Sequence, residues 1–440
     1  MARRIGVRRE DKNAYEARVP LTPDDAARLI EQEIEVFIQP SRIRCYSDNA
    51  YREAGATIAE DLSSCRVIIG VKEMPIDFIK REHTYIFFSH TIKGQKHNMP
   101  LLRQILNQHC TLVDYEKIVD EDGRRPVVFG PFAGMAGMLD SLWALGRRLE
   151  HEGTPNPFSD MQVAHKYGSL ERAKRAVSQL GAQIAREGIS AKLTPMVFGF
   201  IGYGNVSRGA QEVFDLLPHR AITPKELLVQ GNGVSEARHT LYKVVFKEED
   251  LVRRRDASKT FDLAHYYEHP EEYRSDFEQY VPLIAVLVNC VYWTPRYPRL
   301  VTKRLLKQLY APCDPKSRMA LRVIGDISCD IEGSIECTVK ATDPGDPVFV
   351  WQAEDQRAVM GVKGKGPVVL AVDNLPCELP RESSRSFSNA LMPFLPPIVD
   401  ADYTQPIASL SLPGPIRRAV IAHHGALAPD FQYLASYLKE

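Results

Sequence analysis

The chain has 440 residues, of which 44% are hydrophobic, and this length allows two domains with sizeable cores. Its 56 Lys and Arg residues balance 56 Asp and Glu residues, so neither a nucleic-acid partner nor an anionic membrane is expected. No apolar run reaches the roughly 18 residues of a membrane span. The start lacks a signal-peptide core and the eight cysteines form no CxxC pair, which predicts a cytoplasmic protein without a metal site.

The first 130 residues alternate between strand-like and helix-like segments. Strands are predicted at 4–8, 35–39, 66–72, 84–90 and 110–116. The first helix has a clear start signal, because Thr22 can cap it, Pro23 suits its first position and Asp25 suits a capping acid. This alternation predicts a parallel α/β layer.

Two long helices, at 132–153 and 167–188, precede a strand, a glycine turn and a further helix in "PMVFGFIGYGNVSRGAQEVFDLLP". Later apolar runs at 242–246, 283–293, 321–328 and 366–376 predict more strands of a second sheet. The last 40 residues are predicted to be helix and loop. The fold class is therefore α/β, with two Rossmann-like domains whose parallel sheets flank an active-site cleft.

The glycine turn has the strand–turn–helix context of a dinucleotide site. Gly202 allows the tight turn and Gly204 lets the backbone approach a pyrophosphate, while Ser207 replaces the third glycine of the fingerprint. The helix that starts with Asn205, Val206 and Ser207 supplies free N–H groups. The alternative is a glycine-rich turn without a ligand.

The residues that follow this turn bear on the choice of coenzyme. An NAD site would place an acid about 20 residues after the first glycine. Here Glu226 is better explained as the capping acid of Thr223, whereas Arg220 and Lys225 are available for a phosphate. This pattern favours NADP(H) over NAD(H).

Three predicted strands of the first domain end on titratable residues, Lys72, His90 and Glu116. Ligands bind at this edge of open parallel sheets, although each residue could simply mark where the chain emerges into solvent. A partly desolvated lysine and a histidine suit acid–base chemistry, and Glu116 could hold an ammonium group.

Arginines of the same domain suit a carboxylate substrate, because their planar forks grip carboxylates. The segment "YEARVP" contains Glu16 and Arg18, and "DEDGRRPVVFG" contains Arg124 and Arg125. The domain is thus equipped for a substrate that carries both carboxylates and an amine.

Seven ordered segments carry a family resemblance: "REDKNAYEARVPLTP", "GVKEMP", "FFSHTIKGQ", "DYEKIVDEDGRRPVVFGPFAGMAGM", "GYGNVSRGAQ", "GDISCDIEGSIECT" and "VDNLPCELPRESS". The chain resembles lysine–2-oxoglutarate reductase (saccharopine dehydrogenase, L-lysine-forming) and the reductase half of the bifunctional aminoadipic semialdehyde synthase. It is more distantly similar to the alanine dehydrogenase and transhydrogenase superfamily.

The resemblance implies a reductive condensation of L-lysine with 2-oxoglutarate to saccharopine, in lysine degradation, by hydride transfer from NAD(P)H to an imine. Lys72 and His90 match its catalytic pair. The positions that match substrate contacts are Glu16, Arg18, Lys93, Gln95, Glu116, Arg125, Phe129 and Asn289. Further cofactor-side positions are Arg124, Val288, Gly325, Asp326, Ile327 and Ser328.

The family arrangement implies a substrate domain of residues 1–150 plus 375–440 and a dinucleotide domain of residues 156–374. A separately encoded saccharopine dehydrogenase would be a partner, and a homo-oligomer remains open. Two alternatives stay in view. One is an amino-acid dehydrogenase of the alanine dehydrogenase type, and the other is a non-catalytic, nucleotide-binding regulatory protein.

Overall fold

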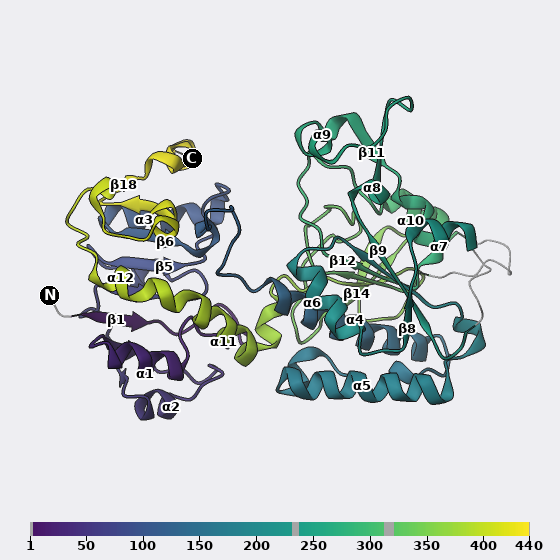
Figure 1. Cartoon of the computed structure of the whole chain (residues 1–440), viewed down its shortest axis with the longest axis horizontal. Helices are drawn as coiled ribbons and strands as arrows, with labels where there is room; N and C mark the ends of the chain where they lie inside the picture. The colour runs from purple at the N-terminus through teal and green to yellow at the C-terminus, as the bar shows by residue number, and fades with distance from the viewer. Residues whose placement is uncertain (1–2, 231–236, 312–320, 440) are drawn as a thin grey trace. The chain divides into compact units, whose positions relative to one another are not determined.

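The computed structural model describes residues 3–230, 237–311 and 321–439, and the chain divides into two compact units (Figure 1). The first unit consists of residues 1–129 and 380–440, and the second of residues 130–379. The predicted substrate segment ran to residue 150, whereas the first unit here ends at Phe129.

The first unit contains an eight-stranded sheet in the order β18-β17-β6-β5-β4-β1-β2-β3. The strands are β1 (Arg4–Val7), β2 (Glu35–Ile38), β3 (Thr57–Ile58), β4 (Val67–Ile69), β5 (Thr84–Phe87), β6 (Thr111–Asp114), β17 (Val420–His423) and β18 (Ala426–Leu427). The six strands from β1 to β6 pair in parallel, so their carboxyl ends share one edge.

Helices cover both faces of this sheet. They are α1 (Pro23–Glu31), α2 (Asp48–Glu53), α3 (Met99–Asn107), α11 (Pro380–Leu391), α12 (Leu395–Asp400) and α13 (Gly414–Arg418). The apolar side chains of α1, α11 and α12 pack in one core with Val7 and Ile69, and those of α3 pack in another with Ile68 and Tyr85. Thr22 caps α1 as predicted, because its hydroxyl accepts a hydrogen bond from the Asp25 N–H.

The prediction of helix and loop for the last 40 residues is incomplete, because this segment also contains two strands. Strands β17 and β18 extend the sheet beyond β6, and both pair in antiparallel fashion. The two strands have only four and two residues, so the sequence around them carries little of the alternation that marks a strand.

The second unit contains another eight-stranded sheet, in the order β15-β14-β16-β13-β12-β7-β9-β8. The strands are β7 (Val197–Ile201), β8 (His219–Ala221), β9 (Leu241–Phe246), β12 (Val286–Asn289), β13 (Val323–Asp326), β14 (Val348–Gln352), β15 (Arg357–Met360) and β16 (Val368–Leu370), with β10 (Val252–Arg254) and β11 (Tyr273–Ser275) in a separate ribbon. Among the described strands of the large sheet, β14 alone runs opposite to the others, because it pairs antiparallel with both β15 and β16. The predicted α/β class with two mostly parallel sheets is therefore confirmed.

The helices of the second unit are α4 (Gly130–His151), α5 (Leu170–Glu187), α6 (Asn205–Phe214), α7 (Pro224–Gln230), α8 (Glu248–Leu251), α9 (Leu263–Glu268) and α10 (Lys303–Leu309). Helix α4 packs closely against α6, and a side chain at Gly134 would come within 1.9 Å of the Val206 carbonyl oxygen. This contact holds the start of α6, and so the glycine turn before it, against the core.

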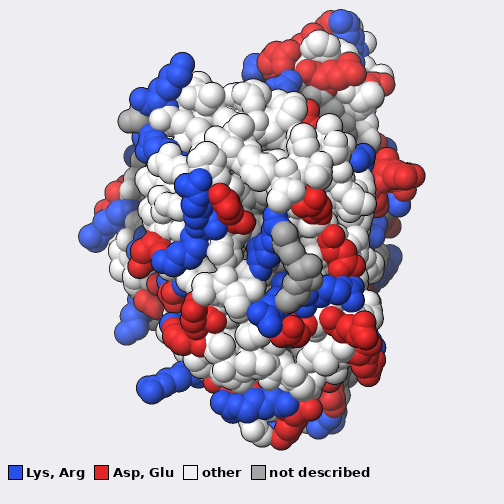
Figure 2. All heavy atoms as spheres, turned by 90° about the vertical axis from the view of Figure 1, so that its left-hand side faces the viewer, with Lys and Arg blue, Asp and Glu red and all other residues white. Residues whose placement is uncertain are grey.

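The charge distribution on one face and the length of the helices both bear on contact with a membrane. On the face shown in Figure 2, basic and acidic side chains are interspersed among uncharged ones, as their equal numbers predict. None of the helices in the described part of the chain is both long and apolar enough to cross a membrane.

Candidate active site

The carboxyl edge of the first sheet gathers the polar residues predicted to be catalytic. Strands β4, β5 and β6 end earlier than predicted, at Ile69, Phe87 and Asp114. Lys72 and His90 lie three residues after β4 and β5, on the loops that leave the sheet. Both side chains are partly buried, so they are shielded from solvent without being closed off from a ligand.

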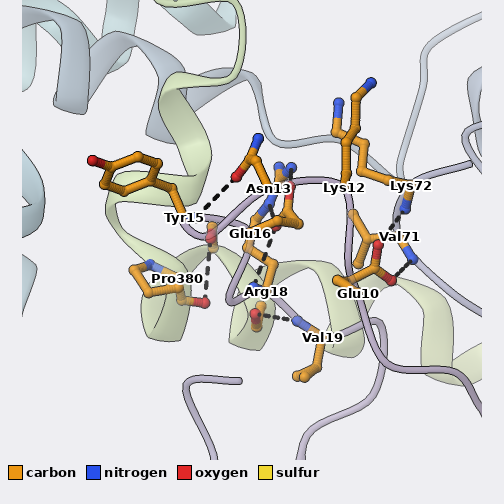
Figure 3. Close-up of polar contacts among 12 residues, drawn as sticks. Glu10, Lys12, Asn13, Tyr15, Glu16, Arg18, Val19, Val71, Lys72 and Pro380 are labelled. Atoms are coloured by element: carbon orange, nitrogen blue, oxygen red, sulfur yellow. Dashed lines mark hydrogen bonds and ion pairs between the residues drawn. The ribbon is translucent and has the colours of Figure 1, made fainter. Parts of the chain in front are cut away.

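The ammonium group of Lys72 lies among other charged groups. In Figure 3 its side chain runs beside that of Lys12, and both ammonium groups point in the same direction. Burial, and then the positive charges of Arg18 and Lys12, lower the pKa of Lys72 below its ordinary value, against the opposing charges of Glu16 and Glu73. A lowered pKa makes the neutral amine more accessible, which is the form that acts as a base.

Glu10, which sequence reasoning missed, holds the backbone that carries Lys72. Its carboxylate accepts hydrogen bonds from the N–H groups of Val71 and Lys72, at 2.6 and 2.9 Å (Figure 3). Burial, and then the charge of Glu16, raise the pKa of Glu10 to about 7. Glu10 follows the end of β1 at Val7 by three residues, the same offset as Lys72 and His90, and this repetition could have identified it.

Stability should therefore depend on the ionisation of Glu10. The raised pKa favours folding while Glu10 is protonated, and this contribution is lost as the pH rises through about 7. Between pH 5 and pH 8 we expect the free energy of unfolding of wild type to fall by up to about 3 kcal/mol more than that of Glu10→Gln. Denaturant unfolding at both pH values measures this, with the exposed Glu35→Gln as the control, and parallel pH dependences in all three proteins would contradict it.

His90 is coupled to a carboxylate. Its Nδ1 lies 2.5 Å from Oε1 of Glu73, and the ammonium group of Lys12 lies 3.1 Å from the other oxygen. Burial opposes ionisation of Glu73, but the hydrogen bond and charge of His90 and the charge of Lys12 lower its pKa to about 2. The backbone of His90 has a left-handed φ of +50°, and its carbonyl oxygen accepts a hydrogen bond from Asn98. The lowered pKa keeps Glu73 ionised, so its carboxylate can hold the imidazole in place through this hydrogen bond.

A buried ion pair lies next to Lys72. Arg18 donates two hydrogen bonds to Glu16, at 2.7 and 2.5 Å, and both side chains are almost fully buried. The guanidinium also lies over the ring of Phe129, 4.3 Å from its centre, and this ring stacks on Phe387. The predicted substrate residues Glu16, Arg18 and Phe129 are therefore in contact with one another.

Four other predicted residues of this unit lie at its surface. Lys93, Gln95, Arg124 and Arg125 are exposed. Gln95 shares the amide of Asn98 with the His90 carbonyl, and Arg125 lies 6.0 Å from the centre of the Phe88 ring, which stacks against His90.

Two predicted residues show no direct tie to Lys72 or His90. Arg124 pairs with Asp122 at 3.2 Å. Glu116 donates its backbone N–H to Asp114, and within the described part of the chain no hydrogen bond or ion pair joins its side chain to Lys72 or His90. Both assignments stay predictions.

The glycine turn of the second unit lies between β7 and α6. Gly202 has a φ of +89°, and a side chain there would come 2.9 Å from Val291, so this position requires glycine. Around Gly204 there is open space, and no side chain of the described residues caps the first turn of α6. Gly204 and Asn205 are exposed and Val206 is partly buried, so the start of α6 is accessible, while Ser207 is buried.

The ends of β12 and β13 add a buried polar pair. The Asn289 amide donates to Asp326 at 2.8 Å and to Ser334 at 2.9 Å, and Thr338 donates to the other oxygen of Asp326 at 2.5 Å. Burial raises the pKa of Asp326 to about 6 against these hydrogen bonds. The side-chain oxygen of Asn289, Oδ1, is buried and lacks a hydrogen-bond partner among the described residues.

The remaining predicted cofactor positions flank this pair. Val288 and Gly325 are paired across β12 and β13, and Ile327 and Ser328 follow β13. The accessible turn and the unpaired Asn289 oxygen, at the same edge of one parallel sheet, fit a nicotinamide dinucleotide. Among the described residues, no group of three or more His, Cys, Asp or Glu side chains could hold a metal ion.

The fold and the glycine turn place the chain among the α/β dehydrogenases. The models of the alanine dehydrogenase/PNT N-terminal and C-terminal domains match residues 6–136 and 229–429, respectively. Because both models match in order and together cover most of the chain, the protein belongs to the alanine dehydrogenase/PNT family. A solved L-alanine dehydrogenase shares the fold, with a TM-score of 0.62 and 18% identity over 99% of each chain.

The chain is also homologous to larger enzymes over nearly its whole length. It is 38% identical to the alpha-aminoadipic semialdehyde synthase of Arabidopsis thaliana over 98% of this chain and 41% of that protein. The bovine mitochondrial synthase is 38% identical over 98% of this chain and 47% of its own length, so the chain spans less than half of these relatives. A saccharopine dehydrogenase [NAD(+), L-lysine-forming] of Yarrowia lipolytica is 26% identical over 88% of this chain and 90% of that protein.

Proposed function

We propose that the protein catalyses the reductive condensation of L-lysine with 2-oxoglutarate to saccharopine, with a reduced nicotinamide dinucleotide as coenzyme. The observation that carries the proposal is the arrangement of Lys72, Glu73 and His90 at one sheet edge. Its support is the homology to semialdehyde synthases over 98% of the chain and to an L-lysine-forming saccharopine dehydrogenase. The coenzyme, when bound, supplies the hydride that reduces the imine.

Lys72 is assigned the role of general base. The lysine substrate must lose a proton from its ε-ammonium group before it can attack the keto carbon. Burial and the charges of Arg18 and Lys12 lower the pKa of Lys72 and so favour its neutral amine, which can accept that proton. Glu10 holds the backbone of Lys72 through two hydrogen bonds, which limits the movement of the base.

His90 is assigned the role of general acid. Loss of water from the carbinolamine requires a proton on the departing hydroxyl group. The ionised Glu73 holds Nδ1 of the imidazole, so the other ring nitrogen is free to donate a proton toward the substrate. Lys12 pairs with the other oxygen of Glu73 and so helps to hold this carboxylate in position beside the imidazole.

A coupled absorbance assay of nicotinamide oxidation tests the proposal. The protein is given 2-oxoglutarate and reduced coenzyme, with either L-lysine or ammonia as the amine. Oxidation that depends on lysine supports the proposal. Oxidation with ammonia alone would instead show an amino-acid dehydrogenase of the alanine dehydrogenase type, and nucleotide binding without turnover of any amine would show a regulatory protein.

Replacement of Arg125 should weaken keto-acid binding. Its guanidinium is exposed and stands over Phe88, near His90, where it can bind a carboxylate. We expect Arg125→Ala to raise KM for 2-oxoglutarate by about 10- to 100-fold, the loss of a charged hydrogen bond, with a small change in kcat. Arg81→Ala, at an exposed arginine paired with Glu82, is the control, and an unchanged KM for Arg125→Ala would remove the carboxylate role.

A further inference from the structure

The strand beside the glycine turn is not the one expected from the sequence. The residues used to favour NADP(H), around Arg220 and Lys225, belong to β8 and α7. Strand β8 lies at the edge of the sheet, and β9 occupies the place next to β7. In a dinucleotide fold, the residue that meets the adenosine ribose follows the strand next to the glycine-loop strand. The residues after β9 therefore decide the coenzyme.

The end of β9 lies directly beside the glycine turn. Ile201 and Phe246 are paired across β7 and β9, and the Gly202 N–H donates to the Phe246 carbonyl oxygen at 3.0 Å. Two residues beyond Phe246 is Glu248, at the start of α8. An acidic side chain thus occupies the ribose position, 46 residues after Gly202 rather than about 20, because β8 and α7 are inserted between β7 and β9.

Glu248 lines a cavity of about 500 Å³ that also includes Gly202 and Gly204. The cavity is largely aromatic, and its aromatic lining residues are Tyr203, Tyr266, Tyr267, Tyr292, Trp293 and Tyr297. The hydroxyl of Tyr267 donates to Glu248 at 2.8 Å, which holds the carboxylate in place. Such walls suit the flat face of an adenine ring, and the carboxylate suits the hydroxyls of its ribose.

No cation offsets this carboxylate within the cavity. Among the described residues that line it, Glu248 is the only charged one. Neither basic residue named from the sequence lines the cavity: Lys225 lies near Asp250, on α8, and Arg220 lies near Glu226, on α7. A phosphate on the 2′-oxygen would meet a like charge here without a partner.

We propose that Glu248 selects the coenzyme, binding the adenosine ribose hydroxyls of NAD(H) and excluding the 2′-phosphate of NADP(H). This inference rests on the proposed use of a nicotinamide dinucleotide, but not on the identity of the amine or keto acid. It reverses the preference for NADP(H) that the residues around Arg220 favoured.

Direct binding to the full chain tests the assignment without turnover. The fluorescence of NADH and of NADPH is titrated with wild type, Glu248→Gln and Glu249→Gln. The last variant removes the same charge from an exposed neighbour on α8 that does not line the cavity. We expect wild type to bind NADH at least about tenfold more tightly than NADPH, and Glu248→Gln to reduce that ratio by at least about tenfold, whereas Glu249→Gln leaves it unchanged.

A second variant guards against loss of structure. Glu248→Asp keeps the charge on a shorter side chain and should still disfavour NADPH, and thermal melting confirms that each variant is folded. Tighter binding of NADPH by wild type, an unchanged ratio in folded Glu248→Gln, or no binding of either coenzyme would overturn the inference. Tight NADH binding without turnover of lysine and 2-oxoglutarate would instead sink the proposed reaction and leave the role of Glu248 intact.

Discussion

Replacement of Lys72 by methionine should lower kcat by about 10²- to 10⁴-fold, the usual contribution of a general base. Methionine keeps the unbranched chain but removes the amine, so the ε-ammonium group of the substrate would have no proton acceptor at this position. Glu10 binds only the backbone of residue 72, and its hydrogen bonds should persist in the variant. Initial rates with saturating lysine and 2-oxoglutarate measure the effect.

Coenzyme binding separates loss of chemistry from loss of structure in this variant. Lys72 lies in the first unit and the glycine turn in the second, so the affinity for reduced coenzyme should be unchanged. Lys80→Met is the matched control, since Lys80 is exposed and its ammonium group donates a hydrogen bond to the nearby Asp77 carbonyl oxygen. A Lys72→Met enzyme with near wild-type kcat would refute the role of base.

Arg18→Ala should destabilise the protein by about 3–5 kcal/mol, because the buried carboxylate of Glu16 loses the guanidinium that donates two hydrogen bonds to it. The same substitution should also shift the dependence of kcat on pH. Arg18 lowers the pKa of Lys72, so without it the neutral amine forms only at higher pH and the rising limb of kcat against pH shifts upward. Denaturant unfolding and a pH series measure the two effects.

The control for Arg18 is an ion pair at the surface of the same unit. Arg4 pairs with Glu35 at 3.1 Å, and both side chains are substantially exposed, so Arg4→Ala should cost no more than about 1 kcal/mol. Arg18→Lys keeps the positive charge but loses the fork, so it should restore the pH profile more fully than the stability. Equal costs for Arg4→Ala and Arg18→Ala would contradict the importance of the buried pair.

Much of the first unit could be predicted from the sequence because its strands are short, apolar and parallel. A residue that follows such a strand must lie at the ligand-binding edge, and this rule pointed to Lys72 and His90, which lie on the loops after β4 and β5 rather than at the strand ends that the sequence predicted. It did not show that Glu73 turns toward His90 or that Glu10 reaches across to the Lys72 loop. These contacts join residues 17 and 62 positions apart, and no local pattern encodes them.

The coenzyme site could also be predicted only in part, because the order of the strands in the sheet is not a local property of the sequence. The glycine turn was recognisable because strand, turn and helix are contiguous at residues 197–214. The strand next to β7 could not be recognised in the same way, because strand order depends on pairing between distant segments. The strand that follows next in sequence, β8, lies at the edge of the sheet, and β9 pairs with β7 instead. The position of Glu248 beside the glycine turn could therefore not be predicted from the sequence near that turn.

The most direct test of the account is the identity of the product. The protein is incubated with 2-oxoglutarate, reduced coenzyme and L-lysine that carries a heavy nitrogen label at its ε-amine, and the products are examined by mass spectrometry. The account predicts saccharopine that retains the label, in a yield equal to the coenzyme oxidised, and none from Lys72→Met beyond its residual rate. Coenzyme oxidation that yields glutamate, or no product containing the lysine skeleton, would contradict it.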